Sequence, residues 1–132
     1  MKRMHVMLKV NDLNESIEFY STLFGVAPAK QKGDYAKWML DDPRVNFSIA
    51  EREGAKGIEH LGIEAETEDE LVELRSNIDR TQALARNEGD TTCCYANSDK
   101  SWVSDPQGVE WEAFHTYGES EEYSGEAEAA CC

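Results

Sequence analysis

The 132-residue sequence contains no apolar run approaching the roughly 20 residues that a membrane-spanning helix needs. The chain starts Met1-Lys2-Arg3, but Lys9 and Asp12 interrupt the apolar stretch that follows too early for a secretory signal peptide. We therefore expect no membrane association and a cytoplasmic location.

Basic residues are also scarce: 13 oppose 27 acidic ones, which gives a net charge of −14. This sign repels nucleic acids and anionic membrane surfaces, so neither is expected as a partner. Part of the acidity lies in residues 118–132, a Glu-, Ser-, Gly- and Ala-rich segment that ends in Cys-Cys. Its few apolar side chains cannot offset the entropy of ordering it, and we expect a disordered tail.

The four cysteines form two adjacent pairs, Cys93-Cys94 and Cys131-Cys132. The spaced cysteines of a secreted disulfide framework are missing, and so is the C-x-x-C spacing of a structural zinc site. The composition therefore predicts free thiols in a reducing compartment.

An internal repeat organises the first 117 residues. The segments 5–10 and 60–65 alternate with period two, which predicts two strands that each have one face in a core. His5 and His60 occupy equivalent positions, on the face opposite to the alternating apolar residues. Those residues are Val6, Leu8 and Val10 in the first segment and Leu61, Ile63 and Ala65 in the second.

A helix is expected after each of these strands. Asn11 or Asp12 can cap the first helix, and Gly25 can end it. Thr67 and Glu70 have the spacing of a capping box for the second helix. The apolar residues at helical spacing are Leu13, Ile17 and Tyr20 in the first and Leu71, Leu74 and Ile78 in the second.

Three further strands are expected in each half. They are predicted near 29–31, 35–40 and 45–50, and near 85–87, 94–98 or 102–104, and 110–116. Residues 89–92 read as a loop and residues 54–57 as the connection between the halves. The pattern predicts one α+β domain, residues 1–117, built from two βαβββ modules at about 1–54 and 57–117.

The last strand of each module adds a third candidate ligand. Val109–Glu112 aligns with Val45–Ser48, so Glu112 corresponds to Ser48. If the modules are related by approximate twofold symmetry, both residues converge with His5 and His60 on one sheet face. Two histidines and a carboxylate with open coordination positions suit iron(II) oxygen chemistry and also admit manganese, nickel or zinc. His115 has the opposite strand parity to Glu112 and is left out of the metal site.

These residues resemble a known group of enzymes. The paired βαβββ modules, both histidines and the Asp105–Gly108 turn before Glu112 are similar to the vicinal oxygen chelate superfamily. That superfamily includes glyoxalase I, fosfomycin-resistance enzymes and extradiol dioxygenases. The resemblance covers residues 1–117 and implies that the two modules form a cupped barrel of mixed sheet.

A second motif narrows the resemblance. Residues 90–96, followed by Asp99-Lys100 and Trp102, resemble the carbon–arsenic lyases, which are iron(II)-dependent dioxygenases, and the related cadmium-induced proteins. The resemblance implies that Cys93 and Cys94 hold the arsenic of a trivalent methyl or aromatic arsenical. Iron(II) and dioxygen would then cleave the carbon–arsenic bond and leave arsenite.

The chemistry of the thiol pair agrees with this role. Trivalent arsenic is a soft electrophile, and a vicinal dithiol can capture it as a chelate. Adjacent strand residues point to opposite faces, so the pair needs irregular backbone, which residues 89–92 can supply. Trp38, Phe47 and Trp102 are candidates to line the pocket, and a flexible Cys131-Cys132 pair could deliver substrate.

Two other functions stay open. One is a non-catalytic cadmium- or arsenic-binding resistance protein. The other is a different superfamily reaction, such as that of a glyoxalase or a thiol transferase, although neither reaction needs a vicinal dithiol. The sequence names no proton-transfer residue, and it fits either a monomer or a homodimer.

Overall fold

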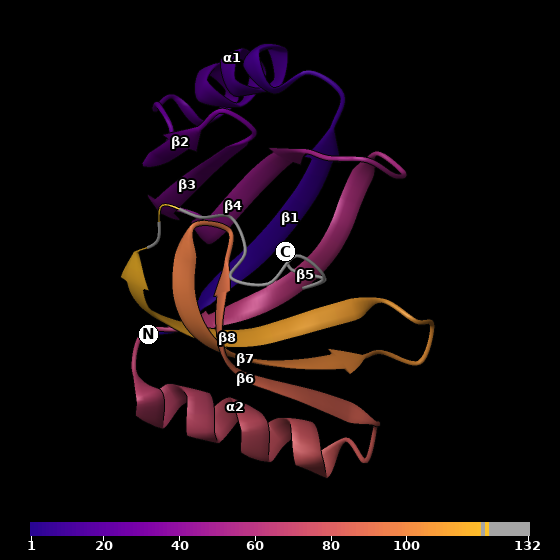
Figure 1. Cartoon of the computed structure of the whole chain (residues 1–132). Helices are drawn as coiled ribbons and strands as arrows, with labels where there is room; N and C mark the ends of the chain where they lie inside the picture. Colours follow the sequence, from indigo (N-terminus) through magenta and orange to yellow (C-terminus); the bar gives the residue numbers. More distant parts are fainter. Residues whose placement is uncertain (120, 122–132) are drawn as a thin grey trace. The chain divides into compact units, whose positions relative to one another are not determined.

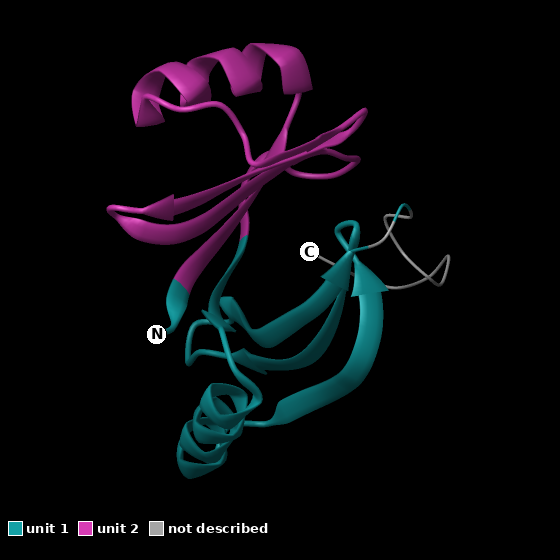
Figure 2. Ribbon diagram, turned by 90° about the vertical axis from the view of Figure 1, so that its left-hand side faces the viewer, with its two compact units in different colours: residues 1–3, 60–132 teal, residues 4–59 magenta. Residues whose placement is uncertain are grey.

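The computed structural model describes residues 1–119 and residue 121, and it divides into two compact units. One unit comprises residues 4–59, and the other comprises residues 1–3 and the chain from His60 onward. In each unit, one helix lies along a face of its own sheet (Figure 2). The division at His60 falls close to the predicted start of the second module.

The first unit is a βαβββ module, as predicted. Its sheet has the strand order β2-β3-β4-β1, in which β1 runs parallel to β4 and the other neighbours are antiparallel (Figure 1). The elements are β1 (Arg3–Val10), α1 (Leu13–Phe24), β2 (Lys30–Lys32), β3 (Tyr35–Asp41) and β4 (Arg44–Glu51).

Helix α1 begins and ends where the sequence predicts. The Asp12 side chain accepts a hydrogen bond from the Glu15 backbone N–H at 3.0 Å, and Gly25 ends the helix in the left-handed conformation with a φ of 74°. The helix packs on the apolar face of its sheet. The buried residues of this core are Leu13, Ala36, Trp38 and Ile49.

The second unit repeats the same topology. Its strand order is β5-β8-β7-β6, with β5 parallel to β8 and the other neighbours antiparallel. The same mixed four-strand order in both units therefore confirms the prediction of two βαβββ modules. The elements are β5 (Gly57–Ala65), α2 (Glu68–Arg80), β6 (Ala85–Cys93), β7 (Ala96–Ser104) and β8 (Glu110–Glu119).

Helix α2 has the predicted cap. The Thr67 hydroxyl accepts from the Glu70 backbone N–H at 3.1 Å, and the Glu70 carboxylate accepts from the Glu66 backbone N–H at 2.8 Å. Its buried core consists of Ala65, Leu71, Leu74 and Ala113. Among the described residues, no helix is both long and apolar enough to cross a membrane.

One sequence prediction about the second module is wrong: residues 89–92 are not a loop but part of β6. The two alternatives for the next strand, 94–98 and 102–104, both overlap the single strand β7, which starts at Ala96. The register shifts between Asn87 and Gly89, where the glycine has a φ of 66°. A bulge at this glycine accommodates the turn-like sequence without ending the strand.

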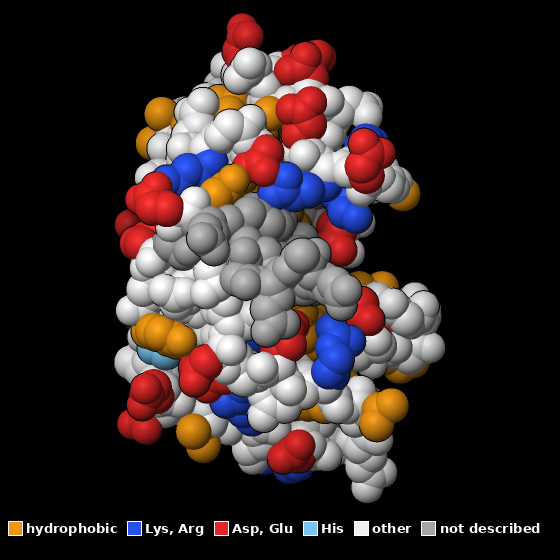
Figure 3. All heavy atoms as spheres, viewed as in Figure 1, with side chains coloured by type: hydrophobic (Ala, Val, Ile, Leu, Met, Phe, Trp, Pro, Cys, Tyr) orange, Lys and Arg blue, Asp and Glu red, His pale blue; other side chains and the backbone are white. Residues whose placement is uncertain are grey.

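Strand β8 extends to Glu119, so the first two residues of the expected tail belong to a strand. Residue 120 and residues 122–132, with Cys131 and Cys132, lie outside the described residues. On the face drawn in Figure 3, acidic side chains occupy several separate places rather than one patch.

Candidate metal and thiol site

The second unit carries polar side chains on the sheet face that turns away from α2. Ala65 and Ala113 belong to the core under α2, so the alternation of each strand turns His60 and Glu112 to the opposite face. Gly62 pairs with Glu112 across the parallel strands and lies two residues after His60. The strand register therefore brings these two side chains onto the same face.

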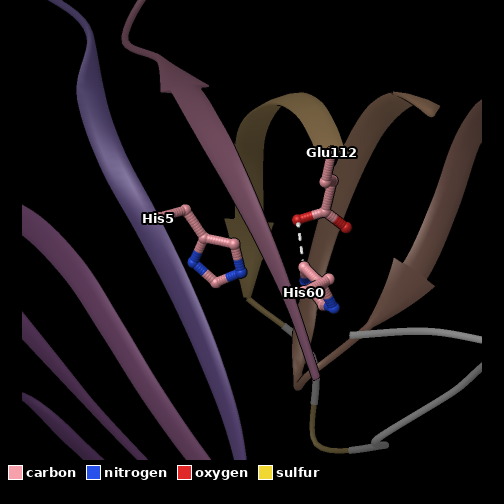
Figure 4. Close-up of side chains that lie close together, drawn as sticks. All are labelled: His5, His60 and Glu112. Atoms are coloured by element: carbon pink, nitrogen blue, oxygen red, sulfur yellow. Dashed lines mark ion pairs between the residues drawn. The ribbon is translucent and has the colours of Figure 1, made fainter. Parts of the chain in front are cut away.

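His60 and Glu112 lie close together in this buried place, each with 2% of its surface exposed. The His60 Nε2 atom is 3.8 Å from Glu112 Oε1, and Figure 4 draws this pair with a dashed line. Two atoms bound to one metal by bonds of about 2.0–2.2 Å can be at most about 4.4 Å apart. The separation therefore fits a shared metal ion.

The other oxygen of Glu112 is held by Lys100. The Lys100 ammonium donates to Glu112 Oε2 at 2.8 Å, and both side chains are buried. The ammonium also lies 5.4 Å from the centre of the Phe114 ring. Lys100 could not be identified as a site residue from the sequence, because its position opposite Phe114 follows only from the β7–β8 register.

Trp102 forms one wall of this place. Its ring meets the His60 ring edge to face, with centres 4.9 Å apart, and its indole N–H donates to Glu88. The two other aromatic candidates, Trp38 and Phe47, pack instead in the core beneath α1. Only Trp102 of the three therefore lies beside a candidate ligand.

Asp99 and Lys100 point to opposite faces of β7, so they contact different side chains. Arg75 on α2 donates to both carboxylate oxygens of Asp99, at 3.0 and 2.7 Å. These hydrogen bonds, more than the burial that opposes them, hold the pKa of Asp99 below its ordinary value. The pair ties β7 to α2 on the face behind Lys100.

His5 belongs to the other unit, where it lies on β1 with 4% of its surface exposed. Its Nδ1 atom is 3.1 Å from the backbone oxygen of Asn46. A carbonyl oxygen only accepts, so in the neutral ring Nδ1 carries the hydrogen and Nε2 keeps the lone pair. This is the tautomer that a metal ligand bonded through Nε2 requires.

The first unit also confirms the correspondence between Ser48 and Glu112. Met7 lies two residues after His5 and pairs with Ser48 across the parallel strands. In the same way, Gly62 lies two residues after His60 and pairs with Glu112. The Ser48 hydroxyl is hydrogen-bonded to Tyr35 Oη at 2.9 Å. The repeat thus places a carboxylate at this position in one half only.

Cys93 and Cys94 lie at the tip of the β6–β7 hairpin. Cys93 ends β6 and pairs with Ala96, while Cys94 and Tyr95 form the turn with φ values of 52° and 61°. Two left-handed central residues are typical of a type I′ turn, and each costs on the order of 1–3 kcal/mol in a residue other than glycine. This turn supplies the irregular backbone that the pair needs and brings the two sulfur atoms to 3.8 Å.

The expectation of free thiols is wrong for these two residues. Cys93 and Cys94 are both disulfide-bonded, and no cysteine among the described residues is free. They are not bonded to each other, because their sulfurs are 3.8 Å apart and a disulfide bond is about 2.05 Å long. Reduction must therefore precede any capture of a soft ligand by the pair.

His115 lies apart from His60 and Glu112. Its parity places it on the Ala113 face of β8, and its Nδ1 atom is 3.1 Å from the backbone oxygen of Ala65. The hydrogen bond and the strand alternation both support its exclusion from the metal site.

We expect His115→Ala to keep full metal affinity, because the ring faces away from Glu112. The loss of one hydrogen bond should lower the free energy of unfolding by about 0.5–1.5 kcal/mol. Equilibrium metal titration and urea unfolding of the same preparation check both values. A variant that no longer binds metal would show that the strand-parity argument is wrong.

The family is established by sequence. The chain belongs to the Glyoxalase/Bleomycin resistance protein/Dioxygenase superfamily, whose family model matches residues 2–113. The prediction from the two histidines and the Asp105–Gly108 turn is thereby confirmed.

Several relatives match almost the whole chain. It is 43% identical over 134 residues to a trivalent organoarsenical cleaving enzyme of Bacillus sp. (strain MD1), with 99% of this chain and 83% of the relative covered. It is 39% identical to a probable trivalent organoarsenical cleaving enzyme of Bacillus subtilis (strain 168), covering 99% and 91%. It is 35% identical to the cadmium-induced protein CadI of Mycobacterium bovis, covering 93% and 82%.

Solved structures confirm the vicinal oxygen chelate fold. An extradiol ring-cleaving dioxygenase from B. fuscum matches with a TM-score of 0.65 at 16% identity, over 90% of this chain and 34% of that one. A Mn(II)-bound glyoxalase from Novosphingobium aromaticivorans matches with a TM-score of 0.62 at 15% identity, over 95% and 44%.

Proposed function

We propose that this protein is an iron(II)-dependent dioxygenase that cleaves the carbon–arsenic bond of trivalent organoarsenicals and releases arsenite. The observation that carries the proposal is the presence of two different sites in one unit. The buried His60–Glu112 pair suits a borderline metal, and the neighbouring Cys93 and Cys94, once reduced, would offer two sulfurs to a soft atom. The names of the two relatives that match 99% of this chain support the same substrate class.

The metal would be held by His5, His60 and Glu112, three buried residues that each offer one ligand atom. Two arguments support His5: it is the repeat counterpart of His60, and its hydrogen bond to Asn46 selects the tautomer in which Nε2 carries the lone pair. A ferrous ion on two neutral imidazoles and one carboxylate would supply electrons and open positions for dioxygen chemistry. The donor chemistry therefore fits the ion.

The substrate would be held by the reduced forms of Cys93 and Cys94. Methylarsenite, CH3As(OH)2, can form two arsenic–sulfur bonds as its two hydroxyl groups leave with the thiol protons as water. A zinc–thiolate bond is about 2.3 Å long, and an arsenic–sulfur bond of similar length would let one arsenic atom bridge sulfurs up to about 4.6 Å apart. The observed separation of 3.8 Å lies within this limit. A reducing cytoplasm would keep the pair in the competent form.

The overall reaction balances with dioxygen as the only oxidant. For methylarsenite, CH3As(OH)2 and O2 give formaldehyde and As(OH)3, so no external reductant is consumed. The dithiol would restrict the position of the arsenic substituent, and such positioning can contribute about 7–11 kcal/mol to a reaction barrier.

The test uses protein reduced with a phosphine and loaded anaerobically with Fe(II). We expect one equivalent of iron to bind, methylarsenite to bind without reaction, and added oxygen to produce arsenite and formaldehyde in equal amounts. Oxygen uptake, arsenic speciation and an aldehyde assay follow the products. Tight arsenical binding without arsenite release would instead favour sequestration, a role that the cadmium-induced relative makes worth testing.

A further inference from the structure

Lys100 is a buried cation beside a candidate metal ligand. Only 2% of its surface is exposed, and its ammonium lies 2.8 Å from Glu112 Oε2. Removing an ammonium from water costs several kcal/mol unless close partners compensate. A neutral side chain of similar length would fill the same space without this cost, so the charge itself calls for a functional explanation.

The first module contains a corresponding hydrogen-bonded pair, Tyr35 and Ser48, in which neither side chain is charged. Tyr35 pairs with Ala50 on the neighbouring strand and reaches diagonally to Ser48, while Lys100 pairs with Phe114 and reaches diagonally to Glu112. Both contacts are short hydrogen bonds, at 2.9 and 2.8 Å. In both halves, therefore, a side chain of the neighbouring strand is hydrogen-bonded to the residue at this last-strand position. That neighbour is a cation only in the half where the residue is a carboxylate.

The two Glu112 oxygens consequently have different surroundings. Lys100 holds Oε2, whereas Oε1 is the atom that lies 3.8 Å from His60 Nε2. A carboxylate can bind a metal through one oxygen or through both. A charge-assisted hydrogen bond to one oxygen, strengthened by low exposure to water, favours binding through the other alone.

We propose that Lys100 is a positioning residue that makes Glu112 a one-oxygen ligand and so keeps a coordination position available. The inference rests on the proposed metal site. Without the ammonium, both carboxylate oxygens can turn to the metal and occupy that position. The phenyl ring of Phe114, 5.4 Å from the ammonium, helps to fix the lysine where it acts.

Co(II) binding to the reduced, full-length protein tests the proposal. In Lys100→Met, X-ray absorption should show one more oxygen ligand than in the parent, and the visible Co(II) bands should weaken as the coordination number rises. Lys100→Arg keeps a cationic donor and should restore the parent spectrum. Tyr35→Phe, which removes the corresponding hydrogen bond in the other half, should leave the spectrum unchanged.

Steady-state kinetics give a second readout. In Lys100→Met, kcat should fall while the KM for the arsenical stays at the parent value, because Cys93 and Cys94 are untouched. If Lys100→Met does not fold, Lys100→Gln is used with the same criteria. A parent protein that binds no Co(II) would overturn the metal site and this inference with it. A parent that binds Co(II) and a folded variant with the same coordination number would overturn the role of Lys100 alone.

Discussion

Glu112→Ala is expected to abolish metal binding and to destabilise the protein at the same time. The substitution removes a proposed ligand, and it also removes the carboxylate that lies 2.8 Å from the buried Lys100 ammonium. Breaking a buried ion pair from one side costs about 3–5 kcal/mol. Metal titration and urea unfolding of the metal-free protein measure the two effects separately.

A double variant distinguishes the two roles of Glu112. In Glu112→Ala/Lys100→Met the buried charge has been removed together with its partner, so much of the lost stability should return. Metal binding should not return, because the ligand is still missing. Ser48→Ala is the matched control in the other half, where only neutral hydrogen bonds, to Tyr35 and Asn46, are lost. Leaving a buried partner unsatisfied is expected to cost about 1–3 kcal/mol.

If Glu112→Ala bound iron as tightly as the parent, Glu112 would not be a metal ligand. It would contradict the ion-pair argument if the double variant were less stable than Glu112→Ala. Both outcomes can be observed in the metal-free and metal-loaded protein without any measurement of turnover.

Much of the fold was predictable because it depends on local sequence patterns, and these patterns occur in both halves of the repeat. Period-two alternation at His5–Val10 and His60–Ala65 identified two equivalent strands. Asp12 and Thr67 marked the helix starts with their capping side chains. The repeat then aligned Glu112 with Ser48, and the register within each unit confirms this correspondence.

The hairpin tip was not predictable from the same rules. Type I′ turns are recognised by Asn-Gly or Asp-Gly, and here Cys94 and Tyr95 occupy the two left-handed positions. The glycine that looks like a turn signal, Gly89, lies instead at a bulge within β6. The turn-type sequence therefore predicted the turn at the wrong position, and the observed turn lies at Cys94 and Tyr95, which local sequence preference does not favour.

The role of Lys100 was not predictable from the sequence for a different reason. A lysine between polar neighbours in a strand is usually solvent-exposed. Its burial and its contact with Glu112 depend on the antiparallel register of β7 and β8, which is fixed by pairing between strands rather than by any local pattern.

Cys93→Ser and Cys94→Ser are each expected to abolish carbon–arsenic cleavage while leaving iron binding intact. The reason is the proposed separation of ligands: histidine and carboxylate would hold the metal, and thiolates would hold the arsenic. Serine preserves the size of the side chain but offers no soft donor. One remaining thiol gives a single, rotatable arsenic–sulfur bond, and a displacement of about 1 Å in the reacting group can lower the rate on the order of a hundredfold.

The comparison must be made on reduced protein, because Cys93 and Cys94 are disulfide-bonded in the structure. Omitting the reductant from the parent is then a control that removes both thiols at once without a mutation, and it should suppress arsenical capture while Fe(II) still binds. Pentavalent arsenicals provide the matching substrate control, since thiolates capture the trivalent form. Serine variants that release arsenite at the parent rate would make the cysteine pair structural. If the serine variants lost iron, Cys93 and Cys94 would belong to the metal site, and the proposed separation of metal ligands from arsenic ligands would be wrong.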